Sequence, residues 1–299
     1  MKDTKLMIAV IGCFAIAVIF ILVIVWEIKK SIDYGQKVRQ LAANVTRTVE
    51  DDNRDFSVYE SIIGIDEREM ILIPEGVFTR GSDGGGFDEK PEQEIYLDAF
   101  YVDKYEVTVK AYNDYRRIAD YVKPSFPFLQ GNAKMLEEPT FAVVGVSWYD
   151  SVNYCKWAGK RLLTEAEWEK AARGTHGLKF PWGNKILEKR ANLAGKADGF
   201  EFVAPVGSFP MGRSVYGVYD MSGNVSEWVL DIYDQFYYQS APMMNPTGPE
   251  KGKNRVFRGG SWDSRSPDLR TSKRFAATEG RKDAVLGFRC GLSKADLIE

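Results

Sequence analysis

A long uncharged segment near the amino terminus constrains this chain more than any other feature. From Leu6 to Trp26 no residue is charged, and most side chains are Ile, Val, Ala or Phe. About 20 such residues in a helix span the hydrocarbon core of a bilayer. The alternative is a cleaved signal peptide, but its apolar core is usually only about 7 to 15 residues long, and no small-x-small cleavage site follows Trp26. We therefore expect a cytoplasmic head of residues 1–5, a transmembrane helix over residues 6–26, and the lipid bilayer as one partner.

Small residues recur at every fourth position within this segment, at Ala9, Cys13 and Ala17. Such a stripe lets another membrane helix approach closely. Alanine is also common enough in membrane spans for the spacing to arise by chance. We retain the stripe as a candidate contact with other membrane-protein subunits.

Residues 27–68 carry a weaker apolar periodicity. Apolar residues recur at steps of three or four among polar and charged ones, at Tyr34, Val38, Leu41, Val45 and Val49. This spacing is typical of one helix face and is close to a heptad seam for about two repeats. The alternative is a marginal amphipathic linker, because coiled coils are identified from longer runs. We predict a helical stalk or linker over this range.

The composition excludes several classes of function. The chain has 299 residues, 44% of them hydrophobic, which is enough for one large domain. Its net charge of −2 comes from interspersed signs without a basic cluster, so we expect no nucleic-acid partner. The single histidine, His176, excludes both the two-His iron site and the three-His zinc site within one chain.

From Met70 onwards the pattern changes to short apolar segments bounded by turn residues. Residues 70–74 and 75–78 are typical of brief strands around a turn, and residues 81–86 form a glycine-rich loop. Capping residues indicate helix starts at Thr108, at Ser147 with Asp150, and at Thr164 with Glu167. Glycines indicate two helix ends, at Gly159 and Gly174. We predict an α+β domain with little regular secondary structure over residues 69–295, and a tail of residues 296–299.

Eight short motifs within this domain occur in a characteristic order. They are Ile73–Phe78, Tyr105–Thr108, Val146–Trp148, Arg161–Glu169, Phe180–Asn184, Gly223–Trp228, Arg258–Trp262 and Gly287–Cys290. Together they resemble the formylglycine-generating (sulfatase-modifying) family over about residues 70 to 292. The resemblance implies a C-type-lectin-like domain with two helices packed on a twisted antiparallel sheet. The tryptophans at positions 148, 168, 182 and 228 are expected to be scaffold, because buried aromatics contribute much of the packing energy of a core.

The resemblance also implies a disulfide between Cys155 and Cys290. The third cysteine, Cys13, lies in the predicted membrane helix. The alternative is a pair of buried thiols in a reducing compartment. A disulfide that closes so long a loop contributes about 4 to 5 kcal/mol in the chain-entropy model.

The orientation in the membrane follows from this disulfide and not from charge. Lys2 and Lys5 precede the span, whereas Lys29 and Lys30 follow it, so charge mildly favours the opposite orientation. Disulfides need an oxidising compartment, and a short head before a long domain is typical of signal anchors. We expect a single-pass protein whose domain is extracytoplasmic, either periplasmic or on the outer face.

The family carries two calcium sites, and the resemblance assigns ligands to both. They are Asn192, Leu193, Asp198 and Phe200 in the first site, and Asp220, Gly223, Val225 and Glu227 in the second. Calcium takes about six to eight hard oxygens from carboxylates, amides and carbonyls, which both segments offer. The alternative is that their Asp-Gly and Gly-Asn pairs are ordinary turns. We expect Ca²⁺ as a structural cofactor.

The catalytic pocket of the family is expected to be degenerate in this chain. Family enzymes oxidise a cysteine of a client sulfatase with a copper ion held by two thiolates, and the resemblance places these positions at Ser264 and Leu269. A hydroxyl and an isobutyl group cannot replace soft sulfur ligands for copper(I). Ser261, which lines the family pocket, is present. We therefore expect no copper and no copper-dependent catalysis.

Three functions remain open from the sequence. The first is a non-catalytic, membrane-anchored scaffold or accessory subunit of a larger membrane complex. The second is a ligand-binding lectin-like module, with residues 263–268 lining the old groove. The third is an oxidase or maturation enzyme with altered chemistry, which the shortage of histidine makes less favoured.

Overall fold

The computed structural model describes residues 59–125 and 136–297. The predicted membrane helix with its stripe of Ala9, Cys13 and Ala17, and the stalk up to residue 58, lie outside these residues. Within the described ranges, no helix has both the length and the apolar character needed to cross a bilayer.

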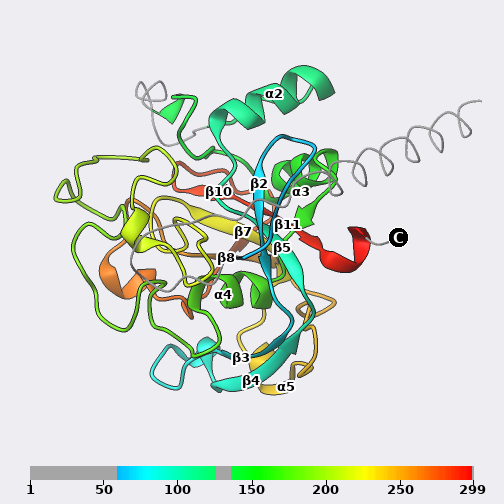
Figure 1. Ribbon diagram of the computed structural model, residues 1–299, viewed down its shortest axis with the longest axis vertical. Helices are drawn as coiled ribbons and strands as arrows, with labels where there is room; N and C mark the ends of the chain where they lie inside the picture. The colour runs from blue at the N-terminus through cyan, green and yellow to red at the C-terminus, as the bar shows by residue number, and fades with distance from the viewer. Residues whose placement is uncertain (1–58, 126–135, 298–299) are drawn as a thin grey trace, which may run out of the picture.

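The largest sheet of the described residues has five strands, in the order β1-β2-β5-β11-β6. Their bounds are Ser61–Ile63 for β1, Glu69–Ile73 for β2, Phe100–Asp103 for β5, Cys290–Ser293 for β11 and Arg161–Leu162 for β6. Every neighbouring pair is antiparallel. Since β11 is nearly the last element and lies between β5 and β6, the carboxyl-terminal segment holds the sheet together (Figure 1).

Strand β1 corrects the stalk prediction, because it lies inside the range 27–68. It pairs with β2, with Ile62 opposite Met70. Three residues are too few to show an alternating pattern, so the strand depends on its partner and not on a local sequence pattern. The sheet therefore begins before the predicted domain start at residue 69.

Two further sheets complete the β structure of the described residues. One has the order β10-β7-β8-β9, with bounds Leu286–Phe288, Ser226–Ile232, Asn254–Arg258 and Phe275–Thr278. In it, β10 and β7 are parallel, so the sheet is mixed where the resemblance implied an antiparallel one. The other is a hairpin of β3, Gly76–Arg80, and β4, Gln93–Leu97. The predicted strands at 70–74 and 75–78 both exist, but they belong to different sheets.

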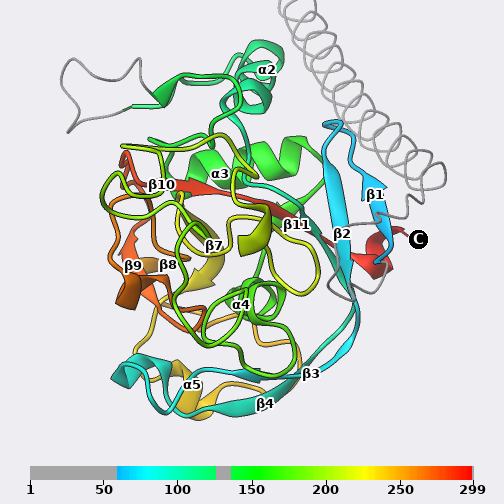
Figure 2. The same cartoon turned by 60° about the vertical axis from the view of Figure 1, so that its left-hand side comes forward.

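The α-helices are α2 at Val109–Ala119, α3 at Trp148–Trp157, α4 at Glu165–Arg173 and the short α5 at Tyr237–Ser240. The helices α2, α3 and α4 begin where their capping residues predicted, whereas the short α5 was not predicted. Single 3₁₀ turns occupy Phe87–Glu89, Pro210–Gly212, Ser266–Leu269 and Lys294–Leu297. Ser147 and Thr164 form complete capping boxes with the acid three residues on. Figure 2 shows α3 beside β10 and β11, and α4 between the sheets and the β3–β4 hairpin.

Two apolar clusters form most of the core. Trp168 of α4 lies in one, with residues of β2, β3 and β7, and Trp228 of β7 lies in the other, with residues of α2, α3 and β10. Trp148 is also buried, but Trp182 is only partly buried and donates its indole N–H to the Lys185 carbonyl. The disulfide between Cys155 of α3 and Cys290 of β11 is confirmed. It fastens α3 to β11, the strand that lies between β5 and β6.

Candidate functional site

The loop after β8 brings Ser264 and Leu269 next to each other. Arg258, the last residue of β8, donates from Nη2 to the Thr271 carbonyl at 2.8 Å and to Glu169 Oε2 at 2.7 Å, which closes the loop at its base. Gly260 has a φ of +69°, and a Cβ there would lie 2.9 Å from Leu269 Cδ2 and 3.3 Å from Ser264 Oγ. The structure therefore places together the two positions that the resemblance assigns to the copper thiolates.

The two serines of this loop are bound to each other. Ser264 Oγ accepts a hydrogen bond from the backbone N–H of Ser261 at 2.9 Å and lies 3.3 Å from Ser261 Oγ. In return, the Ser264 N–H donates to the Ser261 carbonyl at 2.9 Å. Both hydroxyls thus stabilise a tight turn.

The side chain of Leu269 is packed among apolar residues. Its exposed fraction is 0%, and it belongs to a small apolar cluster with Phe180 and Ala191, against which Trp182 and Leu193 pack. The Leu269 carbonyl accepts from Ser222 Oγ at 2.7 Å, which fixes the backbone. A buried isobutyl group offers no lone pair to a metal ion, so this position contributes packing.

A polar cavity of 490 Å³ lies beside the same loop. Phe180, Ser266, Pro267 and Arg270 are among the residues that line it. Although burial opposes ionisation of Glu89, hydrogen bonds from Arg270, the Gly86 N–H and Ser272 lower the pKa of Glu89 to about 2. Arg270 is therefore paired with a permanent carboxylate. The positive charge of Arg270 beside the cavity is therefore balanced by the negative charge of Glu89.

The first predicted calcium segment forms one compact loop. Asp198 accepts hydrogen bonds from the N–H of Leu193 at 2.8 Å and of Phe200 at 3.0 Å, so these three predicted ligands lie together. Asn192 donates its amide to the Phe202 carbonyl at 2.8 Å and to Asn224 Oδ1 at 3.1 Å. The Oδ1 of Asn192 is buried and has no hydrogen-bond partner among the described residues. An unpaired buried oxygen costs free energy unless a ligand or water binds it, which fits a calcium ligand.

In the second predicted calcium segment, the carboxylates of Glu227 and Asp220 accept hydrogen bonds from other protein groups. Both carboxylate oxygens of Glu227 accept hydrogen bonds from Arg289, at 2.7 Å each, and Oε2 also accepts from the Trp168 indole at 2.8 Å. Asp220 accepts from the Gly207 N–H at 2.7 Å. Glu227 is therefore the counter-ion of a buried guanidinium, which sequence reasoning missed because Arg289 lies far along the chain.

Glu106 is a third buried acid in this region and was also missed. Its Oε2 has no hydrogen-bond partner among the described residues, and its Oε1 accepts from Asn224 Nδ2 at 3.1 Å. Burial raises the pKa of Glu106 well above its usual range, and the nearby charge of Asp220 raises it further. Burial also raises the pKa of Asp220. The carboxyl groups of Glu106, Asp220 and Glu227 face the single guanidinium of Arg289, so a proton or a cation is needed for neutrality.

These observations fit a calcium ion that depends mainly on amide and carbonyl oxygens. In the residues that the structure describes, no group of three or more His, Cys, Asp or Glu side chains is arranged to hold a metal. The carbonyls of Leu193 and Phe200 in the first segment, and of Gly223 and Val225 in the second, would have to complete the coordination. The unpaired buried oxygen of Asn192 is the structural support for the first site.

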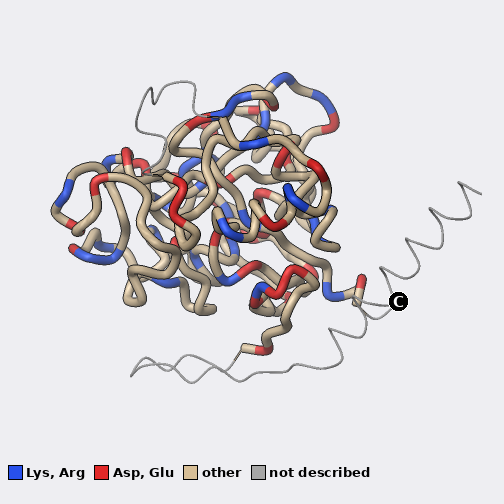
Figure 3. Tube along the Cα trace, turned by 90° about the horizontal axis from the view of Figure 1, so that it is seen from above, with Lys and Arg blue, Asp and Glu red and all other residues tan. Residues whose placement is uncertain are grey.

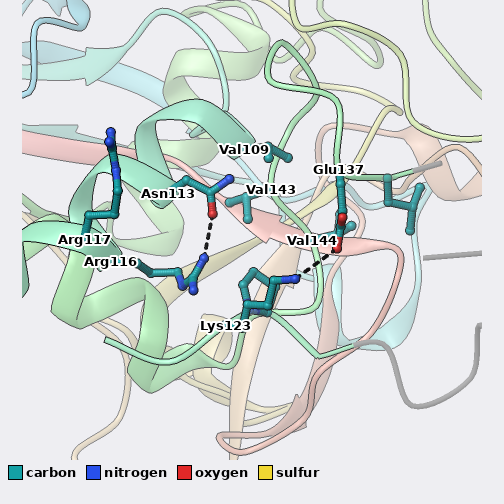
Figure 4. A pocket seen from close by; sticks show the side chains of 10 residues that line it. Val109, Asn113, Arg116, Arg117, Lys123, Glu137, Val143 and Val144 are labelled. Carbon is teal, nitrogen blue, oxygen red and sulfur yellow. Dashed lines mark hydrogen bonds and ion pairs between the residues drawn. The ribbon is translucent and has the colours of Figure 1, made fainter. Parts of the chain in front are cut away.

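A second cavity, of 310 Å³, lies beside α2 and was not predicted (Figure 4). Val109 and Val143 form part of its wall. Its polar groups bind one another, because Arg116 donates to Asn113 at 2.8 Å and Lys123 lies 3.6 Å from Glu137. Basic and acidic residues are intermingled over the described part of the chain (Figure 3).

Comparison with known proteins identifies the family. The model for the sulfatase-modifying factor enzyme 1-like domain matches residues 60–294. The chain is 34% identical over 281 residues to the formylglycine-generating enzyme of Bos taurus, with 74% of each chain covered. It is also 34% identical to the inactive C-alpha-formylglycine-generating enzyme 2 of Bos taurus, covering 74% of this chain and 87% of that protein.

Another relative is much longer than the matched region. The chain is 35% identical to the serine/threonine-protein kinase Pkn1 of Chlamydia trachomatis, covering 88% of this chain. The chain spans 44% of the length of Pkn1. Among solved structures, PvdO from Pseudomonas aeruginosa superimposes with a TM-score of 0.66 at 30% identity, covering 77% of this chain and 95% of PvdO. The chain therefore belongs to the family of proteins with a sulfatase-modifying factor enzyme 1-like domain.

Proposed function

We propose that this chain is a non-catalytic, membrane-anchored scaffold or accessory subunit of a larger membrane complex, with its domain on the extracytoplasmic side. The observation that carries the proposal is the state of the loop after β8. Leu269 is fully buried in an apolar cluster, and the Ser264 hydroxyl is bound within a turn. Neither side chain offers the soft ligand that copper(I) requires. The fold is retained while the reactive groups of the family are replaced.

The position in the membrane is argued from sequence and chemistry. The apolar segment from Leu6 to Trp26 is long enough to anchor the chain. The disulfide between Cys155 and Cys290 supports an oxidising compartment for the domain, since such bonds persist outside the reducing cytosol. Structural calcium would further stabilise the irregular loops around Asn192 and Asp220.

The likeness to the inactive formylglycine-generating enzyme 2 supports loss of catalysis in this family without loss of the fold. A ligand-binding module is the second candidate. It is favoured by the cavity of 490 Å³ beside Ser266 and Pro267. In that function the domain would bind a small polar group where family enzymes carry out chemistry.

The test of non-catalysis is a direct assay of oxidation. The full chain, purified in mild detergent and supplied with copper(I), is incubated with a cysteine-containing peptide while oxygen uptake and peptide mass are followed. We expect no oxygen uptake above that of free copper and no loss of the cysteine. Turnover by the unmodified chain would contradict the proposal.

A further inference from the structure

The outer face of the β3–β4 hairpin carries an exposed apolar row. Val77 of β3 lies opposite Tyr96 of β4. On the other edge of β4, Tyr96 forms a bridge with Met244, and the Tyr96 N–H donates to the Met243 carbonyl at 2.8 Å. Residues directly opposite each other on neighbouring strands project to the same face. Val77, Tyr96 and Met244 therefore form one row across the two strands of the hairpin and the segment bridged to β4.

This row faces solvent and not the core. The adjacent residues Phe78, Ile95 and Leu97 are buried, and successive side chains of a strand point to opposite faces. Val77 is 50% exposed and Met244 is 64% exposed. Contiguous apolar groups on a solvent-facing sheet commonly mark a contact surface, and methionine adapts to different partners.

Carboxylates lie on both sides of the apolar row. Glu94 is opposite Thr79 on one side. On the other side, Glu75 and Asp98 lie near Tyr96: desolvation raises the pKa of the Tyr96 phenol, and the charges of these two acids raise it further. The local potential around the row is therefore negative.

A groove of 620 Å³ continues from Glu75 and Asp98 and also contains Asp296. The cations in this groove are already paired. Arg161 donates to both oxygens of Glu167 at 2.6 Å, and Lys294 lies 3.6 Å from Glu60. Glu75 also interacts with the charge of the buried Lys170, and Asp296 with that of Arg161. The lining carboxylates Glu75, Asp98, Glu167 and Asp296 outnumber the lining cations Arg161 and Lys294, so the groove carries net negative charge beside an apolar row.

We propose that this surface, the β3–β4 face of Glu75, Val77, Tyr96, Asp98, Met244 and Asp296, binds a cationic amphipathic segment of a partner protein. Apolar side chains of the segment pack on the row, and its Lys or Arg side chains reach the carboxylates of the groove. The β3–β4 hairpin lies at the end of the molecule opposite α2 (Figures 1 and 2). The inference rests on the proposed function in one respect, namely that the domain works through contacts with other proteins.

Charge complementarity selects this occupant over two others. An anionic membrane surface would be repelled by the carboxylates. A second copy of the chain, docked through the same face by a two-fold axis, would bring like charges together. A basic segment with an apolar side matches both properties of the face.

The test measures binding of a defined probe to the full chain in zwitterionic nanodiscs, with empty nanodiscs as the blank. The probe is a fluorescein-labelled amphipathic helix of leucine and lysine, compared with the same helix carrying glutamate for lysine. We expect the lysine probe to bind and the glutamate probe not to bind. The double substitution Glu75→Gln/Asp296→Asn is expected to weaken binding about threefold to tenfold, because each exposed ion pair is weak. The matched control, Glu138→Gln/Glu188→Gln, neutralises two exposed acids elsewhere and is expected to leave affinity unchanged.

The apolar row is tested separately. Val77→Thr/Met244→Gln is expected to weaken binding by at least about threefold, whereas Ile118→Gln, at an exposed apolar position on α2, is expected to have no effect. Absence of binding of the lysine probe, or equal affinity of the β3–β4 variants and their controls, would overturn the proposal. Co-purification of a native partner with Glu75→Gln/Asp296→Asn, unchanged from wild type, would overturn this surface while leaving the accessory-subunit function standing.

Discussion

Arg289 and Glu227 form a bidentate ion pair inside the core, in which Nε and Nη2 each lie 2.7 Å from a different carboxylate oxygen. Arg289 also donates to the Tyr219 carbonyl at 2.8 Å and the Asp103 carbonyl at 3.1 Å. The pair therefore joins β7 to the segment between β10 and β11 and to the end of β5. Glu227, which the resemblance assigned to a calcium site, therefore also has a structural role as the partner of Arg289.

Glu227→Gln is expected to destabilise the domain by about 3 to 5 kcal/mol, because it removes the carboxylate that is hydrogen-bonded in a bidentate pair to the buried guanidinium of Arg289. The measurement is denaturant unfolding followed by tryptophan fluorescence. The control is Asp114→Asn, which removes surface ion pairs with Lys110 and Arg117 and should cost less than about 1 kcal/mol. Equal small effects of both substitutions, with and without chelator, would contradict the role assigned to Glu227.

Asp231 predicts a pH dependence of stability. Burial, and then the charge of Glu165, raises the pKa of Asp231 to about 8. Because the folded-state pKa lies above the unfolded-state value, the stabilising contribution of the protonated form is complete at acidic pH and is lost as the pH rises towards about 8. Asp231→Asn should keep the hydrogen bond from the Glu165 N–H, which is 2.7 Å in the wild type, and remove this dependence.

The measurement for Asp231 is the free energy of unfolding of wild type and Asp231→Asn between pH 5 and pH 9. We expect the difference between them to change by up to about 1.4 kcal/mol per pH unit, with the variant gaining relative stability at high pH. Asp263→Asn, at an exposed position, is the control. A difference independent of pH would show that Asp231 does not retain its proton in the fold.

Calcium removal is expected to lower the melting temperature. The physical reason is that Asn192 Oδ1 is a buried oxygen without a partner in the described residues, and a bound cation would satisfy it. The measurement is thermal unfolding with chelator and with added Ca²⁺, together with elemental analysis. Asp198→Asn should reduce the response to Ca²⁺, whereas Asp263→Asn should leave it intact. No response to chelator and no bound metal would contradict the assignment.

Local features of the sequence predicted local structure well. The capping residues Ser147 and Thr164 fix helix starts because their hydrogen bonds are made within three residues. Contacts between distant residues were less predictable. The pairing of Glu227 with Arg289 and the burial of Glu106 depend on the packing of separate elements, which no short pattern records. The pairing of Cys155 with Cys290 was accessible only through family resemblance.

For the loop after β8, the sequence predicted which residues lie together but not how they pack. The resemblance brought Ser264 and Leu269 together, and the structure places both beside Gly260. The closure of the Leu269 position by Phe180 and Ala191 was not predictable, because these residues lie on distant loops. For the same reason, the partial exposure of Trp182 differed from the scaffold expectation.

Restoring both thiols tests whether the loop keeps the geometry of a two-thiolate site. Ser264→Cys/Leu269→Cys is expected to bind copper(I) tightly, since both side chains lie within 3.4 Å of one point above Gly260. Ser264→Cys alone, with one thiolate, is the control and should bind at least about a hundredfold more weakly. The measurement is competition with a chromophoric copper(I) chelator. A folded double variant that binds no better than the control would show that the geometry has been lost.

The central claim is that the chain works as a subunit of a membrane complex. The most direct measurement is extraction of the full chain from its native membranes in mild detergent, followed by native mass spectrometry. The account predicts an assembly larger than the 33.8 kDa chain, with at least one other membrane protein in fixed stoichiometry. A monodisperse monomer without a co-purifying protein, found in several detergents, would contradict the account.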